Sequence, residues 1–573
     1  MNKTNELFLL GNYRKTLKKI TDKSVSSVTI PQNVKEIGED VFSGCNELKT
    51  VIFPDGLQII GDWSFSGCIG LTSLNFPETV TTIGCGAFFR CENLTSLVLP
   101  NNLNSIGRYA FENCTSLTSL IIPENIKTIE SGAFSGCSNL TSVTLPKRRD
   151  CIESAIFADC SGLTSFKFPI GVKRIGSSAF SGCTGFTNIK IPRGVKSIGS
   201  CAFRGCTGLT TLVIPEGVEI IEEYAFKGCT GLTSLILPKS LKCIGDGAFQ
   251  DCPQLTSLYI PEGITSIPYQ AFSGCSSLKS INIPARVTCI SRMAFSDCKS
   301  LTAISLLDNV FEIQEQAFEG CSCLRTISFG KGIRHIGNEA FRGCSSLQKV
   351  IITNLTAWCG ISFDGVDSNP ICLSHHIYSE DGSEITDLII PSDVVTINGR
   401  AFLQCWGLSS LTISNGVKSI GVLAFNQCSF TSATIPDSVT EIGDGAFSSC
   451  GSLSSVKIPE GITQINSHVF ENCFKIVSIE MGNKVTNIGN YAFYGCLDLR
   501  SIKLSQKLRF IGIHTFAGCR TIESIVFPKD ITEIHSTAFK GCTSLKKVTL
   551  PEGKKELIKE FEDCSSNCTI ELY

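Results

Sequence analysis

The sequence predicts a solenoid, a fold in which short coils of similar sequence stack along one axis. Two observations indicate it. A cysteine recurs every 23 residues from Cys45 to Cys344 and, after one interruption, recurs again from Cys405 to Cys542. The same letters return around each cysteine, A-F-x-G-C-x-x-L-T-S-L-x-I-P-x-x-V-x-x-I-G, with a single residue missing before Cys450. Self-similarity at a fixed period of this length is typical of repeat architectures.

The coil at residues 225–245 shows why the pattern forms a strand and then a turn. Its L-T-S-L-I-L segment matches the L-x-x-L-x-L core of a leucine-rich repeat. Because side chains alternate along a strand, Leu235 and Leu237 should point inward and Ile236 outward. Pro238 lacks an N–H and should end the strand. The predicted fold is therefore a right-handed leucine-rich repeat solenoid of 23-residue coils, mostly β within the α/β class, with a parallel concave sheet.

The rest of each coil should close its core. Leu241 and Ile244 turn back inside, and Gly245 is expected to supply the positive φ of a tight corner. An inward phenylalanine then recurs in every coil, from Phe42 to Phe539. We interpret this column as core packing rather than as a cofactor site. Loss of one ring should cost about 3–5 kcal/mol, as in other protein cores.

Breaks in the period divide the chain into five segments. These are an N-terminal cap (1–24), a leucine-rich repeat array (25–352), an island insertion (353–387), a second array (388–553) and a C-terminal cap (554–573). In the first cap, Leu7, Leu10, Leu17 and Ile20 have the spacing of one apolar helical stripe. Caps are expected because the open ends of a solenoid must be shielded.

The island has its own composition. Trp358 is expected to pin an ordered loop onto the solenoid, because a buried indole N–H needs a partner. A zinc site is the alternative, and it would make the protein an enzyme or sensor supported by the arrays. The residues that could form it are Cys359, Cys372, His375, His376, Asp364 and Asp367. Their spacing lacks the paired C-x2-4-C clamp, so we predict no metal and no cofactor.

The chain has 31 cysteines, of which 22 occupy the repeat position if Cys564 in the degenerate last coil is counted. A small thiol fits a tight turn, and free cysteine is among the most buried residue types. No signal-peptide core is recognisable. Buried, reduced thiols are therefore favoured over disulfides between coils.

Composition and motifs exclude several classes of function. Lys and Arg number 50 against 52 Asp and Glu, so no excess of positive charge favours a nucleic-acid partner. No apolar run approaches the length of a membrane span. The sequence has no G-x-S-x-G nucleophile elbow, and its repeat cysteines should be buried. We therefore expect a recognition module and no enzyme.

The candidate binding surface is the outward column of the strands, on the concave sheet. Val213, Ile236 and Tyr259 stand on three successive strands among Thr and Ser side chains, and exposed apolar residues with a polar rim mark interaction sites. The alternative is that β-branched residues simply favour strands. Lys167 and Lys190 could steer an acidic partner. The candidate residues are Val213, Ile236, Tyr259, Val98, Ile121, Lys167 and Lys190. The partner would be a protein or a glycan, and the oligomeric state stays open.

The repeat resembles that of the BspA-like group of leucine-rich repeat proteins. Phe-x-Gly-Cys and Leu-Pro recur where that group has them, over about nine-tenths of the chain. The island is similar as well, with Leu355-Thr-Ala-Trp358-Cys359, Ser368-Asn369-Pro370 and His376. The resemblance implies a surface antigen or adhesin that binds host proteins or other cells. It implies a cell-surface location, whereas the sequence, with no signal peptide or anchor seen, favours the cytoplasm.

Overall fold

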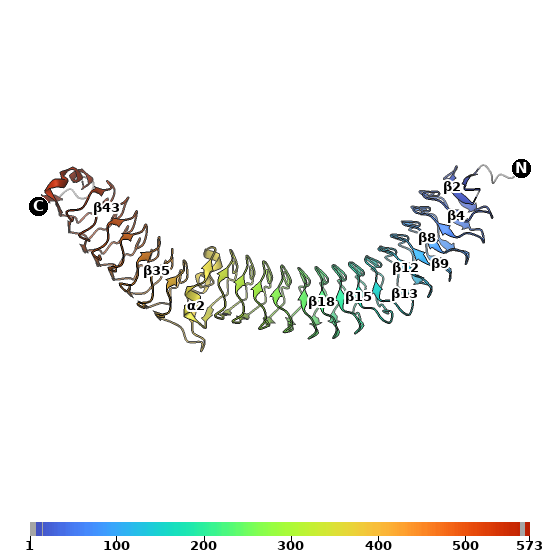
Figure 1. The fold of residues 1–573 in the computed structure, drawn as a ribbon, viewed down its shortest axis with the longest axis horizontal. Helices are drawn as coiled ribbons and strands as arrows, with labels where there is room; N and C mark the ends of the chain where they lie inside the picture. The colour runs from blue at the N-terminus through green and yellow to red at the C-terminus, as the bar shows by residue number, and fades with distance from the viewer. Residues whose placement is uncertain (1–6, 14, 562–567) are drawn as a thin grey trace. The chain divides into compact units, whose positions relative to one another are not determined.

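The computed structural model describes residues 7–13, 15–561 and 568–573, and it confirms the solenoid. About 24 coils stack through mostly parallel strands, and only 4% of the residues are helical (Figure 1). The chain divides into two compact units. The N-terminal unit comprises Met1–Arg286 with Met293–Leu301, and the C-terminal unit comprises Val287–Arg292 with Thr302–Tyr573.

Most coils contribute two short strands, and these form two separate ladders. We call the ladder formed by the L-T-S-L strands the first face. We call the ladder formed by the two-residue strands that end at the isoleucine of the I-G corner the second face. Strand β19 (Ser234–Ile236) illustrates the first face, because it pairs in parallel with β17 (Thr211–Val213) at a register of 23 residues. The period of the sequence is therefore the register of the sheet, and equivalent side chains of successive coils are neighbours.

In the N-terminal unit the other first-face strands are β3 (Ser27–Thr29), β5 (Thr50–Ile52), β7 (Ser73–Asn75), β9 (Ser96–Val98), β11 (Ser119–Ile121), β13 (Ser142–Thr144), β21 (Ser257–Leu258) and β23 (Ser280–Ile281). The second-face strands are β4 (Glu36–Ile37), β6 (Ile59–Ile60), β8 (Thr82–Ile83), β10 (Ser105–Ile106), β12 (Thr128–Ile129), β14 (Cys151–Ile152), β15 (Arg174–Ile175), β16 (Ser197–Ile198), β18 (Ile220–Ile221), β20 (Cys243–Ile244) and β22 (Ser266–Ile267).

In the C-terminal unit the first-face strands are β25 (Ala303–Leu306), β27 (Thr326–Phe329), β29 (Lys349–Ile352), β31 (Ile377–Tyr378), β32 (Asp387–Ile390), β34 (Ser410–Ile413), β36 (Ser432–Thr434), β38 (Ser455–Lys457), β40 (Ser478–Glu480), β42 (Ser501–Lys503), β44 (Ser524–Val526), β46 (Lys547–Leu550) and β47 (Thr569–Leu572). The second-face strands are β24 (Cys289–Ile290), β26 (Glu312–Ile313), β28 (His335–Ile336), β30 (Ser362–Phe363), β33 (Thr396–Ile397), β35 (Ser419–Ile420), β37 (Glu441–Ile442), β39 (Gln464–Ile465), β41 (Asn487–Ile488), β43 (Phe510–Ile511) and β45 (Glu533–Ile534).

The phenylalanine column fills the core, as predicted. Phe226 is fully buried and lies between two rings of the same column. Its centroid is 5.3 Å from that of Phe203 and 5.5 Å from that of Phe249, with the rings within 3° of parallel. One ring per coil therefore stacks on the next, and each layer of the core is shared with its neighbours.

The repeat cysteines that the structure describes are buried as predicted, and most of their thiols contact the coil that precedes them. The Sγ of Cys68 donates to the carbonyl oxygen of Phe42 at 3.1 Å, and the same bond recurs along the column to Cys542 and Phe516 at 3.2 Å. The Phe42 carbonyl also accepts the backbone N–H of Cys45, so the thiol adds a second hydrogen bond that links neighbouring coils. Their reduced state stays a prediction, and Cys564 lies outside the described residues.

The corner glycine has a different role from the one expected. Gly245 does not have a positive φ, whereas Gly247, two residues later, has φ 57°. A Cβ on Gly245 would lie 2.5 Å from the backbone nitrogen of Glu223 in the preceding coil. Gly245 therefore permits the close approach of two backbones. The left-handed backbone conformation belongs to Gly247, in the turn that follows.

The N-terminal residues form a hairpin, so the predicted helical stripe is wrong. Strand β1 (Phe8–Gly11) pairs antiparallel with β2 (Thr16–Ile20), and β2 pairs in parallel with β4. Leu17 and Ile20 are buried against the first coil. The exposed second-face ladder offers β2 a full set of backbone partners, and this pairing over a long sequence distance outweighs the local spacing of the leucines. At the other end, the 3-10 segment η2 (Glu552–Phe561) buries Leu557 and Phe561.

The island contributes to both ladders as well as carrying helices. Its β30 and β31 extend the second and first faces by pairing with β28 and β29. Helix α2 (Leu355–Cys359) lies between β29 and β30, and η1 (Val366–Ser368) and α3 (Ile371–Ser374) lie between β30 and β31. Trp358 is the buried pin that the sequence predicts, and its Nε1 donates to the carbonyl oxygen of Ala401 at 2.8 Å. Its ring meets Phe329 edge-on at 5.2 Å.

Replacing Trp358 by Phe should destabilise the C-terminal unit by about 1–3 kcal/mol. Phenylalanine keeps most of the packing but removes the N–H, which leaves the buried Ala401 carbonyl with only the longer hydrogen bond from Asn369 Nδ2, at 3.5 Å. The measurement is the free energy of unfolding in urea. Trp406→Phe is the matched control, because Trp406 is 50% exposed and its loss should change stability by no more than about 0.5 kcal/mol. Equal effects of the two substitutions would contradict the pin.

Candidate recognition surface

The outward column of the first face is exposed, as the alternation of the strands requires. The exposed fractions are 58% for Val98, 70% for Ile121, 58% for Val213, 56% for Ile236 and 61% for Tyr259. Lys167 and Lys190 are exposed as well. In contrast, Leu212 and Leu235 on the same strands are buried. Apolar side chains are therefore exposed to solvent in these coils. Other coils have threonine or serine at the same outward position.

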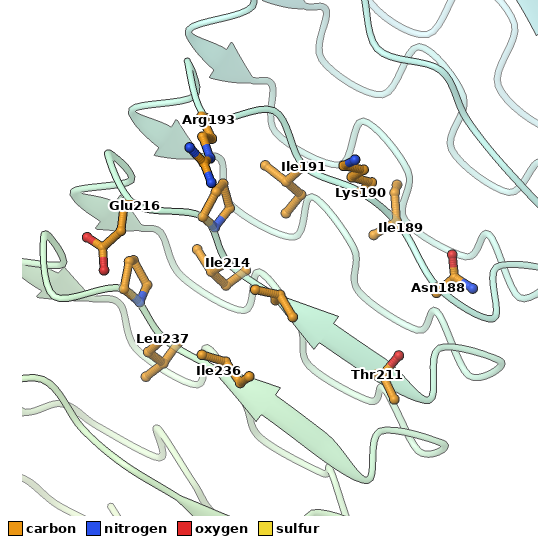
Figure 2. Close-up of a pocket in the computed structure, with 13 residues that line it drawn as sticks. Asn188, Ile189, Lys190, Ile191, Arg193, Thr211, Ile214, Glu216, Ile236 and Leu237 are labelled. Carbon is orange, nitrogen blue, oxygen red and sulfur yellow. The ribbon is translucent and has the colours of Figure 1, made fainter.

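A groove of about 690 Å³ opens on this face in the N-terminal unit (Figure 2). Its lining residues are Asn188, Ile189, Lys190, Ile191, Arg193, Thr211, Val213, Ile214, Pro215, Glu216, Ile236, Leu237 and Pro238. Figure 2 shows Arg193 and Glu216 at the end where the strands turn, and Asn188 and Thr211 at the opposite end. We call this surface the first-face groove.

Three of the seven candidate residues line the first-face groove, namely Lys190, Val213 and Ile236. Tyr259 stands one coil beyond Ile236, and Lys167 one coil before Lys190, whereas Val98 and Ile121 lie farther along the face. Sequence reasoning missed Arg193 and Glu216. Each of these two residues directly follows the proline that ends the first-face segment of its coil. A charged residue after this proline in two successive coils is the sequence pattern that could have indicated them.

The groove lies where the first-face ladder is interrupted. Between β13 and β17, two coils have no first-face strand, and a single bridge joins Asn188 to Thr211. The second-face ladder continues through the same coils from β14 to β20. The coils are thus held together on one face and less closely on the other, so that the strand-like backbone at residues 188–190 borders an open hollow.

Additional large rings lie in the coils at this interruption. Phe166, Phe168 and Phe186 stand at positions where the adjacent coils have leucine, isoleucine or valine. The centroid of Phe166 is 4.7 Å from that of Phe180 and 4.9 Å from that of Phe168. Additional ring volume in a filled core displaces the backbone around it. Phe186 is fully buried, whereas Phe166 and Phe168 are half-buried.

The charged side chains of the groove differ in whether they already have a hydrogen-bond or ion-pair partner within the protein. The carboxylate of Glu216 accepts hydrogen bonds from the backbone nitrogens of Lys239, at 3.0 Å, and Ser240, at 3.3 Å. The side chains of Lys190 and Arg193 pair with no carboxylate among the residues that the structure describes. The groove therefore combines an aliphatic floor with two cations that have no charged partner in this chain.

A second hollow of about 570 Å³ occupies the first face of the C-terminal unit, over β38, β40 and β42. Its outward charges are Lys457, Glu480 and Lys503. The Nζ of Lys503 lies 2.8 Å from Oε1 of Glu480, and this hydrogen bond lowers the pKa of Glu480. The charges here compensate one another, so this hollow presents less free charge than the first-face groove.

The structure does not bring the zinc candidates together. His376 Nδ1 lies 2.6 Å from a carboxylate oxygen of Glu384, and His375 Nδ1 lies 3.1 Å from the carbonyl oxygen of Gln404. The Sγ of Cys372 donates to the carbonyl oxygen of Leu403 at 3.7 Å. Across residues 7–13, 15–561 and 568–573, no three His, Cys, Asp or Glu side chains converge on a point where a metal ion would bind. The alternative of a metal-bearing island therefore has no ligand set.

Two further properties bear on function. Burial raises the pKa of repeat thiols such as Cys137, Cys229 and Cys275 to about 12, which makes these thiols poor nucleophiles near neutral pH. Within the described part of the chain, no helix combines the length and the apolar character needed to cross a membrane.

Comparisons with known proteins show the same repeat. The family described as BspA type Leucine rich repeat region matches six overlapping segments, at residues 19–141, 64–187, 150–278, 242–368, 374–500 and 486–573. No curated protein sequence matches this chain. Solved structures with detectable likeness include leucine-rich repeat proteins of bacteria.

A leucine-rich cell surface protein from Faecalibacterium prausnitzii is 30% identical over 62% of this chain and 96% of its own, with a TM-score of 0.41. A leucine-rich repeat protein from Bacteroides ovatus is 22% identical, over 98% of this chain and 94% of its own, with a TM-score of 0.28. The pneumococcal vaccine antigen PcpA is 24% identical, over 61% and 77%, with a TM-score of 0.36. At these TM-scores the likenesses carry no information about ligands. The family match covers most of the chain, and the protein is a member of the BspA-type leucine-rich repeat family.

Proposed function

We propose that this protein is a non-enzymatic recognition module, which binds another protein or a glycan on the first face of its N-terminal unit. The observation that carries the proposal is the exposure of Val213 and Ile236 on neighbouring strands within the first-face groove. Contiguous apolar surface with a polar rim is a mark of an interaction site. Tyr259 continues the surface by one coil, and tyrosine is enriched at the energetic centres of interfaces.

The fold supports such a role because its 23-residue register places equivalent side chains of successive coils next to one another. Side chains on the first face are held by a backbone that stacks on a continuous core, so a partner would meet residues from several coils in fixed positions. Little ordering would then be needed on binding, which favours affinity. The proposal includes display at a cell surface, which the resemblance to BspA-like proteins implies. Antibody labelling of intact cells tests that location.

A double substitution, Ile236→Glu with Tyr259→Glu, tests the binding surface. Partners are first captured from cells or host extract on the unmodified protein, and the dissociation constant of the purified partner is then measured for both forms. Each substitution buries a carboxylate in an apolar contact, so binding should weaken by at least about tenfold. The thermal unfolding midpoint should stay unchanged, because both side chains point outward.

Ile389→Glu is the matched control. Ile389 occupies the same outward position on β32 in the C-terminal unit and is 61% exposed. This change should leave the affinity as it is. An unaltered affinity of the double variant, with Ile389→Glu weakening the complex, would move the recognition surface to the other unit.

A further inference from the structure

The stretch around the first-face groove has an unusual charge. Residues 160–215 contain seven lysines and arginines and no aspartate or glutamate, in a chain whose totals are 50 and 52. The seven are Lys167, Lys173, Arg174, Lys190, Arg193, Lys196 and Arg204. More than two successive coils therefore carry positive charge only, although the chain as a whole is nearly neutral.

Three of these cations lie at the groove or beside it. Lys190 and Arg193 line it, and Lys167 occupies the outward position one coil before Lys190. No carboxylate pairs with any of the three among the described residues. Lys196, in contrast, lies 3.6 Å from Glu219. Glu216 is the single acidic residue in the lining, and its oxygens already accept backbone N–H groups from the next coil.

The floor of the groove determines what kind of anion fits. Val213, Ile214 and Ile236 give it an aliphatic character, and no aromatic ring is among its lining residues. Sugars and nucleic-acid bases stack on flat aromatic faces, which this groove does not offer. Aliphatic side chains of a peptide would instead bury apolar area on the floor. The occupant should therefore be both acidic and apolar.

We propose that the first-face groove binds an acidic peptide segment whose apolar side chains contact Val213 and Ile236 while its carboxylates pair with Lys190 and Arg193. This assignment rests on the proposed recognition function and names its partner class. Lys167 extends the positive surface of the groove by one coil. It therefore favours a peptide with further acidic residues at the end that lies over this coil. Opposite charge on partner and groove accelerates association and disfavours basic partners.

Selection from a displayed library of short random peptides tests the partner class. Peptides enriched on the unmodified protein should contain acidic residues together with Val, Ile, Leu or Phe. Their dissociation constants should rise at least about tenfold for a Lys190→Glu, Arg193→Glu double variant. That variant should itself select peptides in which lysine and arginine replace the acidic residues. Affinity for the unmodified protein should fall as salt is added.

Lys457→Glu is the control, because it reverses a charge at the equivalent outward position in the C-terminal unit. It should select the same acidic peptides as the unmodified protein. Peptides without acidic bias, an unchanged selection by the double variant, or binding of a sulfated glycan array in place of any peptide would each overturn the assignment. Recognition itself would still stand if captured partners lost affinity for the Ile236→Glu, Tyr259→Glu form, so the two failures are distinguishable.

Discussion

Above about pH 9 the protein is expected to lose stability steeply, because its buried thiols can ionise only when the chain unfolds. Burial raises the pKa of Cys68, Cys229 and Cys275 to about 12 in the fold. A cysteine in an unfolded chain has a pKa of about 8.5. Below about pH 8.5 the thiols are protonated in both the folded and the unfolded chain, so they do not affect the free energy of unfolding. Between the two values only the unfolded chain releases protons, so stability falls as pH rises.

The size of this effect follows from the number of thiols. Each one lowers the free energy of unfolding by up to about 1.4 kcal/mol per pH unit within this window. Because successive coils each contain a buried thiol, their effects on the free energy of unfolding add. Urea unfolding at a series of pH values from 8 to 11, roughly spanning the lower part of the window, measures the slope directly.

Cys229→Ala separates the thiols from lysine and tyrosine, which also titrate at alkaline pH. The variant loses some packing at every pH, but its slope should be shallower by about 1.4 kcal/mol per pH unit. Stability that stays constant up to about pH 11 would contradict the buried reduced thiols. Disulfide bonds between successive coils would give that result, since an oxidised sulfur has no proton to lose.

Replacing Phe226 by Ala should destabilise the N-terminal unit by about 3–5 kcal/mol. The ring is fully buried between Phe203 and Phe249, and the parallel ladder of the second face prevents the coils from closing the cavity. Because repeat stability is a sum over neighbouring coils, the loss should be local. The coils around residue 226 should then unfold at a lower urea concentration than the rest.

The control for this change is Phe474→Ala. Phe474 is 44% exposed and lies outside the stacked column, so its removal should cost no more than about 0.5 kcal/mol. Urea unfolding followed by circular dichroism compares the two. A Phe226→Ala protein with unaltered stability would mean that the column is not the core of the coil.

The periodicity of the sequence predicted the inside of this protein well. Phe226 and Cys229 are buried because a 23-residue register returns each position to the same place in the core. The pattern failed at the N-terminus, where Leu17 and Ile20 have helical spacing but occupy a strand. That strand depends on a ladder formed by residues farther along the chain, which no local pattern can show.

The candidate recognition surface was predictable only in part. Alternation along a strand placed Lys190, Val213 and Ile236 outward, and all three line the first-face groove. The groove itself was not predictable, because it depends on the spacing of the coils. The hollow brings Arg193, from a turn, beside residues of the strands. Packing in three dimensions determines this arrangement.

Amide hydrogen exchange of the protein with and without its captured partner tests the central claim most directly. If the partner binds in the first-face groove, exchange should slow at residues 188–191 and 211–216, and at the strand Ser234–Ile236. The second-face strands of the same coils should exchange as before, because the core separates them from the bound partner. Protection confined to the second face, or to the island at residues 353–387, would contradict the account.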